Sequence, residues 1–157
     1  MKLTVAAKSD PGILSDHNED HYVLCSDIGL YMVADGVGGH KAGHVASHIG
    51  CQLVEQLVRD GLRKAPDDPT VHDIILGDAI QEANRSILEI GRDDEAKRGL
   101  GSTFLALWFH GDRVLFACVG DSRIYLLRDS QLTQLSHDDK AGRYRLAAAL
   151  GHEETAD

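Results

Sequence analysis

The sequence has 157 residues, of which 43% are hydrophobic and 26% are charged, and this composition is typical of one globular domain rather than a disordered or fibrous chain. It carries 16 Lys and Arg against 25 Asp and Glu residues, for a formal net charge of −9. Such an acidic chain is unsuited to nucleic acids and anionic membranes, because their phosphates repel it, so we expect neither as a partner.

The first third of the chain reads as strands. Residues 3–8 are expected to form a strand that ends before the turn signal Pro11-Gly12. Two β-rich runs, at 21–26 and 30–34, are separated by a short polar turn and predict an antiparallel hairpin. The second run is expected to stop at Asp35, where a glycine-rich segment begins.

Two helices are expected next, followed by four strands. Apolar residues recur every three or four positions over 43–62 and again from about 67 to 91, as on one face of a helix. Beyond Gly99 the pattern favours strands, which we place at 103–109, 113–119, 123–128 and 131–135. Short turns separate them, so we expect one antiparallel meander. A short helical piece is expected at 145–150. This order predicts an α+β fold in which helices pack on antiparallel sheet.

The cysteines and the N-terminus indicate the cellular compartment in which the protein is expected. Cys25, Cys51 and Cys118 are odd in number and widely spaced, which argues against a disulfide framework or a thiolate zinc site. The N-terminus is too short and polar for a signal peptide, and no stretch approaches the roughly 18 apolar residues that span a membrane. We therefore expect a cytoplasmic protein.

Three short motifs contain acids that suit cation chemistry. Asn18-Glu19-Asp20 stands directly before a strand, where neighbouring side chains point to opposite faces, so Glu19 and Asp20 do not both reach one atom without a water between them. Asp35 and Gly36 precede further glycines at the end of a strand, where backbone carbonyls can approach a ligand. Asp121 lies in a tight Gly-Asp turn. Carboxylate and carbonyl oxygens suit Mg²⁺ or Mn²⁺.

Each motif also has an ordinary structural explanation. An isolated N-E-D is most often a charged surface turn, and a Gly-Asp turn is common between strands. The glycines after Asp35 do not make a dinucleotide-binding G-x-G-x-x-G, because Lys41 occupies the position of the last glycine. His40, His44 and His48 share one helical face, but without the glutamate of H-E-x-x-H, so surface histidines are favoured over a zinc site.

Taken in order, the motifs carry more information than each does alone. The series S-D-x-G, N-E-D, A-D-G-x-G-G-H, G-S-T and V-G-D-S-R resembles that of the metal-dependent serine/threonine protein phosphatases of type 2C, their bacterial branch in particular. The resemblance extends over about residues 9–139. It implies a four-layer α-β-β-α sandwich of two antiparallel sheets flanked by helices, with two Mg²⁺ or Mn²⁺ ions, and in bacterial members a weaker third, at one end.

The resemblance also implies roles for individual residues. Asp35 resembles the carboxylate that bridges two ions, the Gly36 carbonyl a further ligand, and Glu19 a ligand acting directly or through water. Asp20 resembles the acid that orients bound water, and Asp121 the one that helps to hold the third ion. The implied reaction is hydrolysis of phosphoserine and phosphothreonine in proteins by a metal-bridging water, which opposes a serine/threonine kinase.

The sequence departs from the family pattern in two places. Ser15 stands where the family has an arginine that binds the substrate phosphate, which we expect to cost about 1.5–3 kcal/mol of phosphate binding. The family's later metal-binding aspartates, in D-G-x-x-D and N-D segments, have no match here. We therefore expect residues 1–157 to be a type 2C-like domain that lacks its C-terminal strands, with exposed sheet edges and one poorly held ion.

These departures leave alternative functions open. One is a weak or inactive pseudophosphatase that binds a phosphoprotein or serves as a regulatory module. Another is a purely structural or interaction domain.

Overall fold

A computed structural model describes residues 2–13, 16–37, 42–65, 71–97, 99–111 and 113–136. Ser15, His40 and the helical piece expected at 145–150 lie outside these ranges. All statements about structure below concern the described residues.

The first two strands form the expected hairpin. β1 (Asp20–Cys25) pairs antiparallel with β2 (Leu30–Val37) in a register that sets Asp20 opposite Asp35. The connection turns at Gly29, whose φ of 71° favours glycine. The expectation that β2 stops at Asp35 is wrong. The two-residue strand β3 (Gly101–Ser102) pairs with the end of β2 and so extends it through Val37.

The later strands divide between two sheets. β4 (Phe104–His110) and β5 (Arg113–Val119) complete a five-stranded antiparallel sheet of order β1-β2-β4-β5, with β3 beside β2. β6 (Tyr125–Arg128) and β7 (Gln131–Gln134) form a separate hairpin. A continuous meander is therefore wrong: the chain leaves the first sheet after β5, at Gly120, whose φ is 94°.

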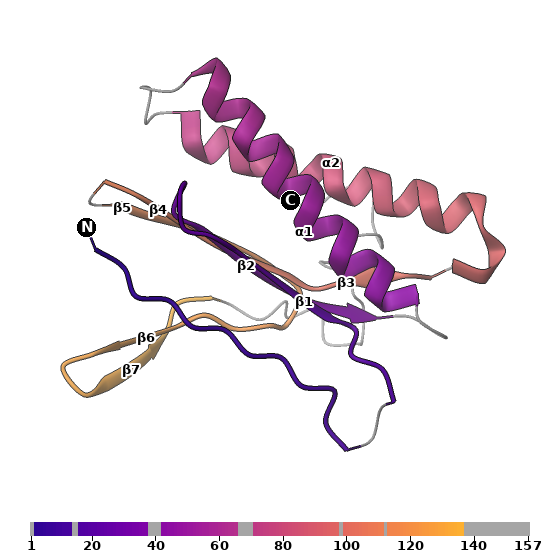
Figure 1. Cartoon of the computed structure of the whole chain (residues 1–157), viewed down its shortest axis with the longest axis horizontal. Coiled ribbons are helices and arrows are strands. Elements are labelled where there is room, and N and C mark those ends of the chain that lie inside the picture. Colours follow the sequence, from indigo (N-terminus) through magenta and orange to yellow (C-terminus); the bar gives the residue numbers. More distant parts are fainter. Residues whose placement is uncertain are drawn as a thin grey trace.

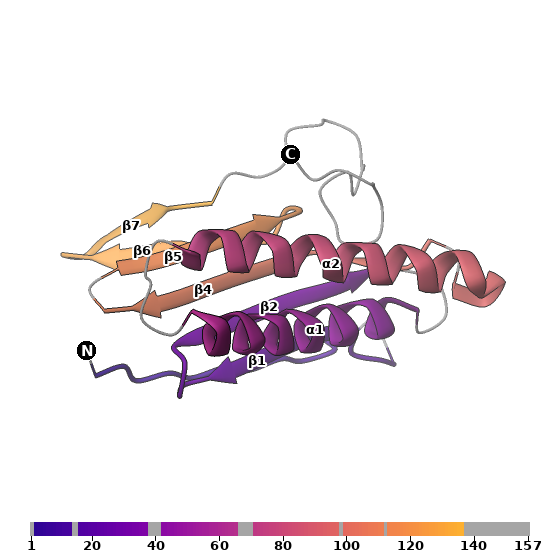
Figure 2. The same cartoon turned by 90° about the horizontal axis from the view of Figure 1, so that it is seen from above.

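Two long helices cover one face of the larger sheet. α1 (Ala42–Lys64) and α2 (His72–Asp93) confirm the two expected helices, and α2 is followed by the short 3-10 helix η2 (Glu95–Lys97). The start expected for α2, at 67–70, lies outside the described residues. Figure 1 shows both helices on the same side of the sheet, and Figure 2 shows them side by side above it. Neither helix, among the residues described, is long and apolar enough to cross a membrane.

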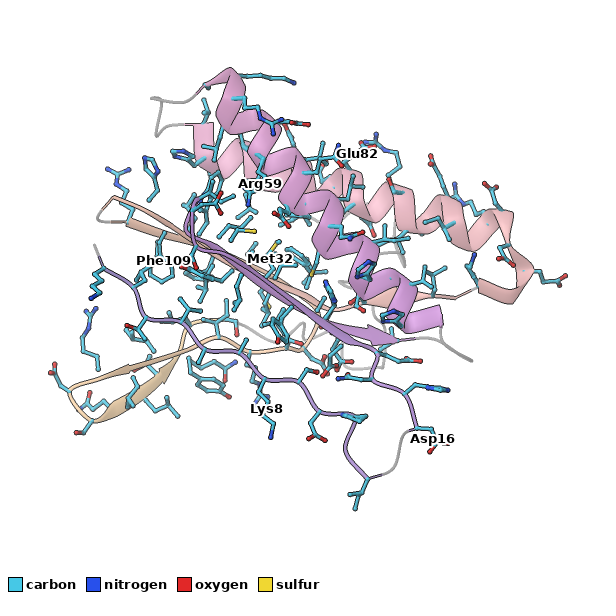
Figure 3. The ribbon with its side chains drawn as sticks, in the orientation of Figure 1. Lys8, Asp16, Met32, Arg59, Glu82 and Phe109 are labelled. Atoms are coloured by element: carbon cyan, nitrogen blue, oxygen red, sulfur yellow. The ribbon has the colours of Figure 1, made fainter. Side chains whose placement is uncertain are left out.

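The core lies between these helices and the sheet. Met32 on β2 belongs to it and is 1% exposed, whereas Glu82 on α2 lies on the solvent side of the helix layer (Figure 3). Trp108 fills one end, and its indole N–H donates a hydrogen bond of 3.0 Å to the Ile28 carbonyl. Further buried members, all at 0% exposure, are Leu30, Ala34, Ala46, Cys51, Val54, Val58, Ala83, Ile87 and Phe104.

The opposite face of the sheet is thinly covered. The N-terminal segment 2–13 and the β6–β7 hairpin lie below it in Figure 1. Residues 3–7 and 123–125, together with the sheet, line a cavity of about 440 Å³. The strand expected at 3–8 is wrong, because this segment pairs with no strand among the described residues and forms no regular structure. Lys8 on it points away from the sheet (Figure 3). The large apolar side chains left exposed here include Tyr22, Leu24, Val33, Phe116, Leu127 and Leu132.

The α+β class of two antiparallel sheets with helices packed against them is thus confirmed. A second helical layer, on the far side of β6–β7, is not part of the described residues.

Candidate functional site

Asp35 is the centre of an acidic group at one end of the larger sheet. It lies on β2 directly opposite Asp20, and its side chain is on the face away from the helices. Burial raises the pKa of Asp35, and the nearby Asp20, Asp121 and Glu19 raise it further. The structure therefore brings together the four acids of all three motifs, although they are far apart in sequence.

The backbone of Asp35 is held on both sides by one threonine. The Asp35 N–H donates to Thr103 Oγ1 at 3.0 Å, and the Thr103 N–H donates to the Asp35 carbonyl at 2.9 Å. The Ser102 hydroxyl donates to the same carbonyl at 3.0 Å. These contacts fix the backbone of Asp35 relative to the β3–β4 segment and so place this residue at the end of the sheet.

Thr103 also connects Asp35 to the loop that carries Asp121. Its Oγ1 lies 2.8 Å from Ser122 Oγ, a hydrogen-bond distance. Gly120 packs on the same residue, since a Cβ at Gly120 would lie 2.9 Å from Thr103 Cγ2. The left-handed backbone at Gly120 and this contact turn the loop back over Thr103, which places Asp121 within electrostatic reach of Asp35.

Asp20 is oriented by the chain before β1. The Asp20 N–H donates to Asn18 Oδ1 at 3.0 Å, and the Ser9 hydroxyl donates to Asp20 Oδ2 at 3.1 Å. Asn18 Nδ2 donates in turn to Ser9 Oγ at 2.7 Å. The two motifs S-D-x-G and N-E-D thus form one hydrogen-bonded unit that positions a single carboxylate.

Glu19, the residue before β1, lies beside the first turn of α1. Its carbonyl accepts hydrogen bonds from the Gly36 N–H at 3.2 Å and from the Ser47 hydroxyl at 2.6 Å. Its carboxylate oxygen Oε2 lies beside the place where a side chain on Gly43 would stand, and the Gly36 carbonyl oxygen is 2.8 Å from the same point. Because Gly43 has no side chain, a carboxylate and a carbonyl oxygen share one small cradle between β2 and α1.

The expectation that Glu19 and Asp20 diverge agrees with this geometry. Asp20 is paired with Asp35 at the end of the sheet, and Glu19 turns towards the first turn of α1. In the part of the chain that the structure describes, no three His, Cys, Asp or Glu side chains already converge on one cation position. The acids are therefore gathered around Asp35 without forming a closed coordination shell.

The supporting residues that have no role in the sequence analysis include Ser9, Gly43, Ser47 and Thr103. Ser9 and Thr103 belong to the S-D-x-G and G-S-T motifs, so their place in the series of motifs is the sequence feature that could have identified them as site residues. Gly43 and Ser47 looked like ordinary helix residues, and only their contact with Glu19 distinguishes them.

The family model and the similar proteins all indicate the same protein family. The family model described as protein phosphatase 2C matches residues 15–154. The serine/threonine protein phosphatase PstP of Mycobacterium tuberculosis is 38% identical over 141 residues, which are 88% of this chain and 26% of PstP. The serine/threonine phosphatase stp of Listeria welshimeri is 34% identical over 136 residues, which are 83% of this chain and 52% of stp. The chain thus spans about half or less of the length of these relatives.

Solved structures agree with the sequence relatives. The catalytic domain of PstP in complex with two manganese ions superposes with a TM-score of 0.77 at 32% identity, covering 96% of this chain and 67% of that one. PppA, a regulatory component of the type VI secretion system (T6SS) in Pseudomonas aeruginosa, gives 0.78 at 27% identity, covering 97% and 67%. The match to the family model over most of the chain, together with these relatives, shows that the chain belongs to the protein phosphatase 2C family.

Proposed function

We propose that this chain contributes the acidic centre of a metal-dependent protein phosphatase that hydrolyses phosphoserine and phosphothreonine in proteins. The observation that carries this proposal is the crowding of Asp20, Asp121 and Glu19 around Asp35 in a member of the phosphatase 2C family. Residues 1–157 are taken as part of one such domain. A phosphorylated protein would be the substrate, and a serine/threonine kinase would supply it.

The donor atoms fit divalent ions of the Mg²⁺ or Mn²⁺ type. All are oxygens, which these hard cations prefer. The pKa of Asp35 is raised by burial and then by the neighbouring carboxylates, and a bound cation would offset both effects. Glu19 and the Gly36 carbonyl share a cradle that the missing side chain of Gly43 leaves open. We assign two ions to Asp35, Glu19 and the Gly36 carbonyl, and a third, weaker ion to Asp121 beside Asp35.

The chain's own residues prepare the site for the reaction. Thr103 holds the backbone of Asp35, so the main chain that carries this carboxylate does not need to move when a cation enters. Ser9 fixes one oxygen of Asp20, which leaves this carboxylate in place to orient a water beside Asp35. Bound ions would supply a lower pKa for the attacking water and charge neutralisation on the phosphoryl oxygens.

The test is phosphate release from a phosphothreonine peptide with Mn²⁺. We expect Asp35→Asn to lower the rate by about a hundredfold or more, because it removes the central charge without changing the side chain's shape. The matched control is Asp129→Asn, in the β6–β7 turn, where φ is 51° and asparagine is well tolerated. A rate that Asp35→Asn leaves unchanged would refute the metal mechanism.

A second candidate is a pseudophosphatase that binds a phosphoprotein without hydrolysing it. Ser15 in place of the phosphate-binding arginine favours it. So does the absence of three convergent ligand side chains within the described ranges. Calorimetry with the same phosphopeptide separates the two functions: peptide binding without Mn²⁺-dependent release supports the binding module.

A further inference from the structure

Thr103, which lies between β3 and β4, touches both neighbours of Asp121. Gly120, the residue before Asp121, packs on the methyl group of Thr103, since a Cβ at Gly120 would lie 2.9 Å from Thr103 Cγ2. Ser122, the residue after Asp121, approaches the hydroxyl group, with its Oγ 2.8 Å from Thr103 Oγ1. One side chain therefore contacts the loop of Asp121 on both sides of this aspartate.

The Thr103 hydroxyl also reaches the strand that carries Asp35. Its Oγ1 accepts the hydrogen bond from the Asp35 N–H at 3.0 Å. Because Thr103 is only 2% exposed, water competes little with either contact. Ser122 is held on its other side as well, since the Cys118 thiol donates to the Ser122 carbonyl at 3.4 Å. A single buried oxygen thus connects the main chain of β2 to the loop that follows β5.

Like charges oppose this position of the loop. Burial and the neighbouring Asp20 raise the pKa of Asp35, and Asp121 is close enough to raise it further. Carboxylates at such distances repel one another, so the loop of Asp121 is pushed away from Asp35 unless other contacts hold it. The side chain of Asp121 is exposed, so its own packing does not supply the restraint. The contacts of Thr103 with the residues on either side of Asp121 do supply it.

We propose that the hydroxyl groups of Thr103 and Ser122 form a latch that holds the Asp121 loop, residues 119–123, against the Asp35 end of the sheet. Both are positioning residues, because they act through the two aspartates and not on the substrate. The latch is a property of the folded chain, whereas its consequence for hydrolysis rests on the proposed function. Opening the latch would separate Asp121 from Asp35 and so weaken any function that needs both carboxylates together.

Limited digestion with trypsin measures the latch without metal or substrate. Arg123 is exposed but Ile124 is 7% exposed, so trypsin needs the loop to open before it can cleave between them. Cleavage after Arg85, in the middle of α2, reports opening of the fold as a whole. Relative to that reference, we expect Ser122→Ala and Thr103→Val to raise the rate of cleavage after Arg123 about three- to tenfold, as loss of one hydrogen bond predicts.

Three further variants separate the latch from a general structural role. Thr103→Ser keeps the hydroxyl group and should be cleaved nearly as slowly as the wild type. Thr133→Val makes the Thr→Val change on exposed β7 and should have no effect. Because the two hydroxyls form one contact, the double variant Thr103→Val with Ser122→Ala should open no more than Thr103→Val alone. Additive effects, equal rises after Arg123 and Arg85, or unchanged cleavage in Ser122→Ala would overturn the proposal, and Ser122→Ala remains a test if Thr103→Val does not fold.

Phosphate release from the phosphothreonine peptide tests the consequence of the latch. Ser122→Ala should raise the Mn²⁺ concentration that gives the half-maximal rate about three- to tenfold and leave the KM for the peptide nearly unchanged, because the latch acts on the aspartates. Release by the wild type with the same Mn²⁺ dependence in Ser122→Ala would refute the positioning role. No release by the wild type would refute the proposed function, and the tryptic cleavage rates would then decide on the latch alone.

Discussion

Two aspartates of this chain have pKa values that are shifted in opposite directions by their surroundings. Asp35 lies among other carboxylates, and desolvation together with these charges raises its pKa above the ordinary value of 3.8. Asp27, in the turn before β2, is bound through both oxygens by the Arg59 guanidinium at 2.6 and 3.1 Å, and this lowers its pKa. The first arrangement opposes folding without a cation, whereas the second supports folding by itself.

The Asp27 pair predicts how stability depends on pH. Because the folded-state pKa lies below the unfolded value of 3.8, the pair stabilises the protein above that value and the benefit is lost as pH falls through the folded pKa. We expect Asp27→Asn to lower the Tm slightly near neutral pH, with a difference that shrinks in acid and at high salt. Asp129→Asn should show neither effect. A deficit that stays constant with pH would contradict this account.

The sequence predicted the acids of the site but not their supports. Glu19, Asp35 and Asp121 stand in motifs, so the series of motifs identified them. Thr103 stands in the G-S-T motif, but the sequence gives it no role. Its contacts with Asp35 and Ser122 depend on the pairing of β3 and β4 with β2, which no local pattern encodes.

At the scale of elements, the junction of β2 and α1 depends on close backbone approach. A Cβ on Gly43 would lie 2.6 Å from the Gly36 carbonyl carbon and would also meet the Glu19 carboxylate. Gly77, on α2, has nothing within 4 Å of the same position. Both are helical glycines, yet only one of them is required by packing.

This contrast predicts opposite effects of the same substitution. Gly77→Ala should stabilise the protein by about 0.5–1 kcal/mol, because alanine favours the helix. Gly43→Ala should instead destabilise it by about 1–3 kcal/mol, because the methyl group overlaps the backbone of β2. Urea unfolding of the two variants measures both values. Equal gains in stability would show that the junction is looser than described.

Helices and hairpins were the elements that the sequence predicted best, since their periodic patterns and turn residues are local. The Asp129-Ser130 turn, with φ values of 51° and 62°, is one example. The expected strand at 3–8 failed because a strand needs a neighbour, and pairing is not a local property. The same reason explains why β2 runs past Asp35 to meet β3.

For the whole molecule, most of the core lies between the helices and one face of the sheet. Ile87 on α2 is fully buried there, whereas Leu127 on β6 is 70% exposed. The hairpin β6–β7 therefore contributes little buried apolar surface. The order of the expected elements predicted the α+β class correctly, but the separation of β6–β7 into a second sheet follows from the left-handed turn at Gly120.

This imbalance predicts unequal costs for two apolar substitutions. Ile87→Ala should lower the free energy of unfolding by about 2–5 kcal/mol, because it leaves a cavity in the core. Leu127→Gln should change it by less than about 0.5 kcal/mol, as expected for an exposed position. Denaturant titrations of both variants give the comparison. A large loss in Leu127→Gln would mean that the hairpin is packed against something further.

Calorimetric titration with Mn²⁺ tests most directly whether the acids around Asp35 form a cation site. We predict saturable Mn²⁺ binding by the wild type and by Asp129→Asn, and binding at least about tenfold weaker in Asp35→Asn, whose fold is checked by circular dichroism. Binding of equal strength in all three proteins, or no binding in the wild type, would contradict the account.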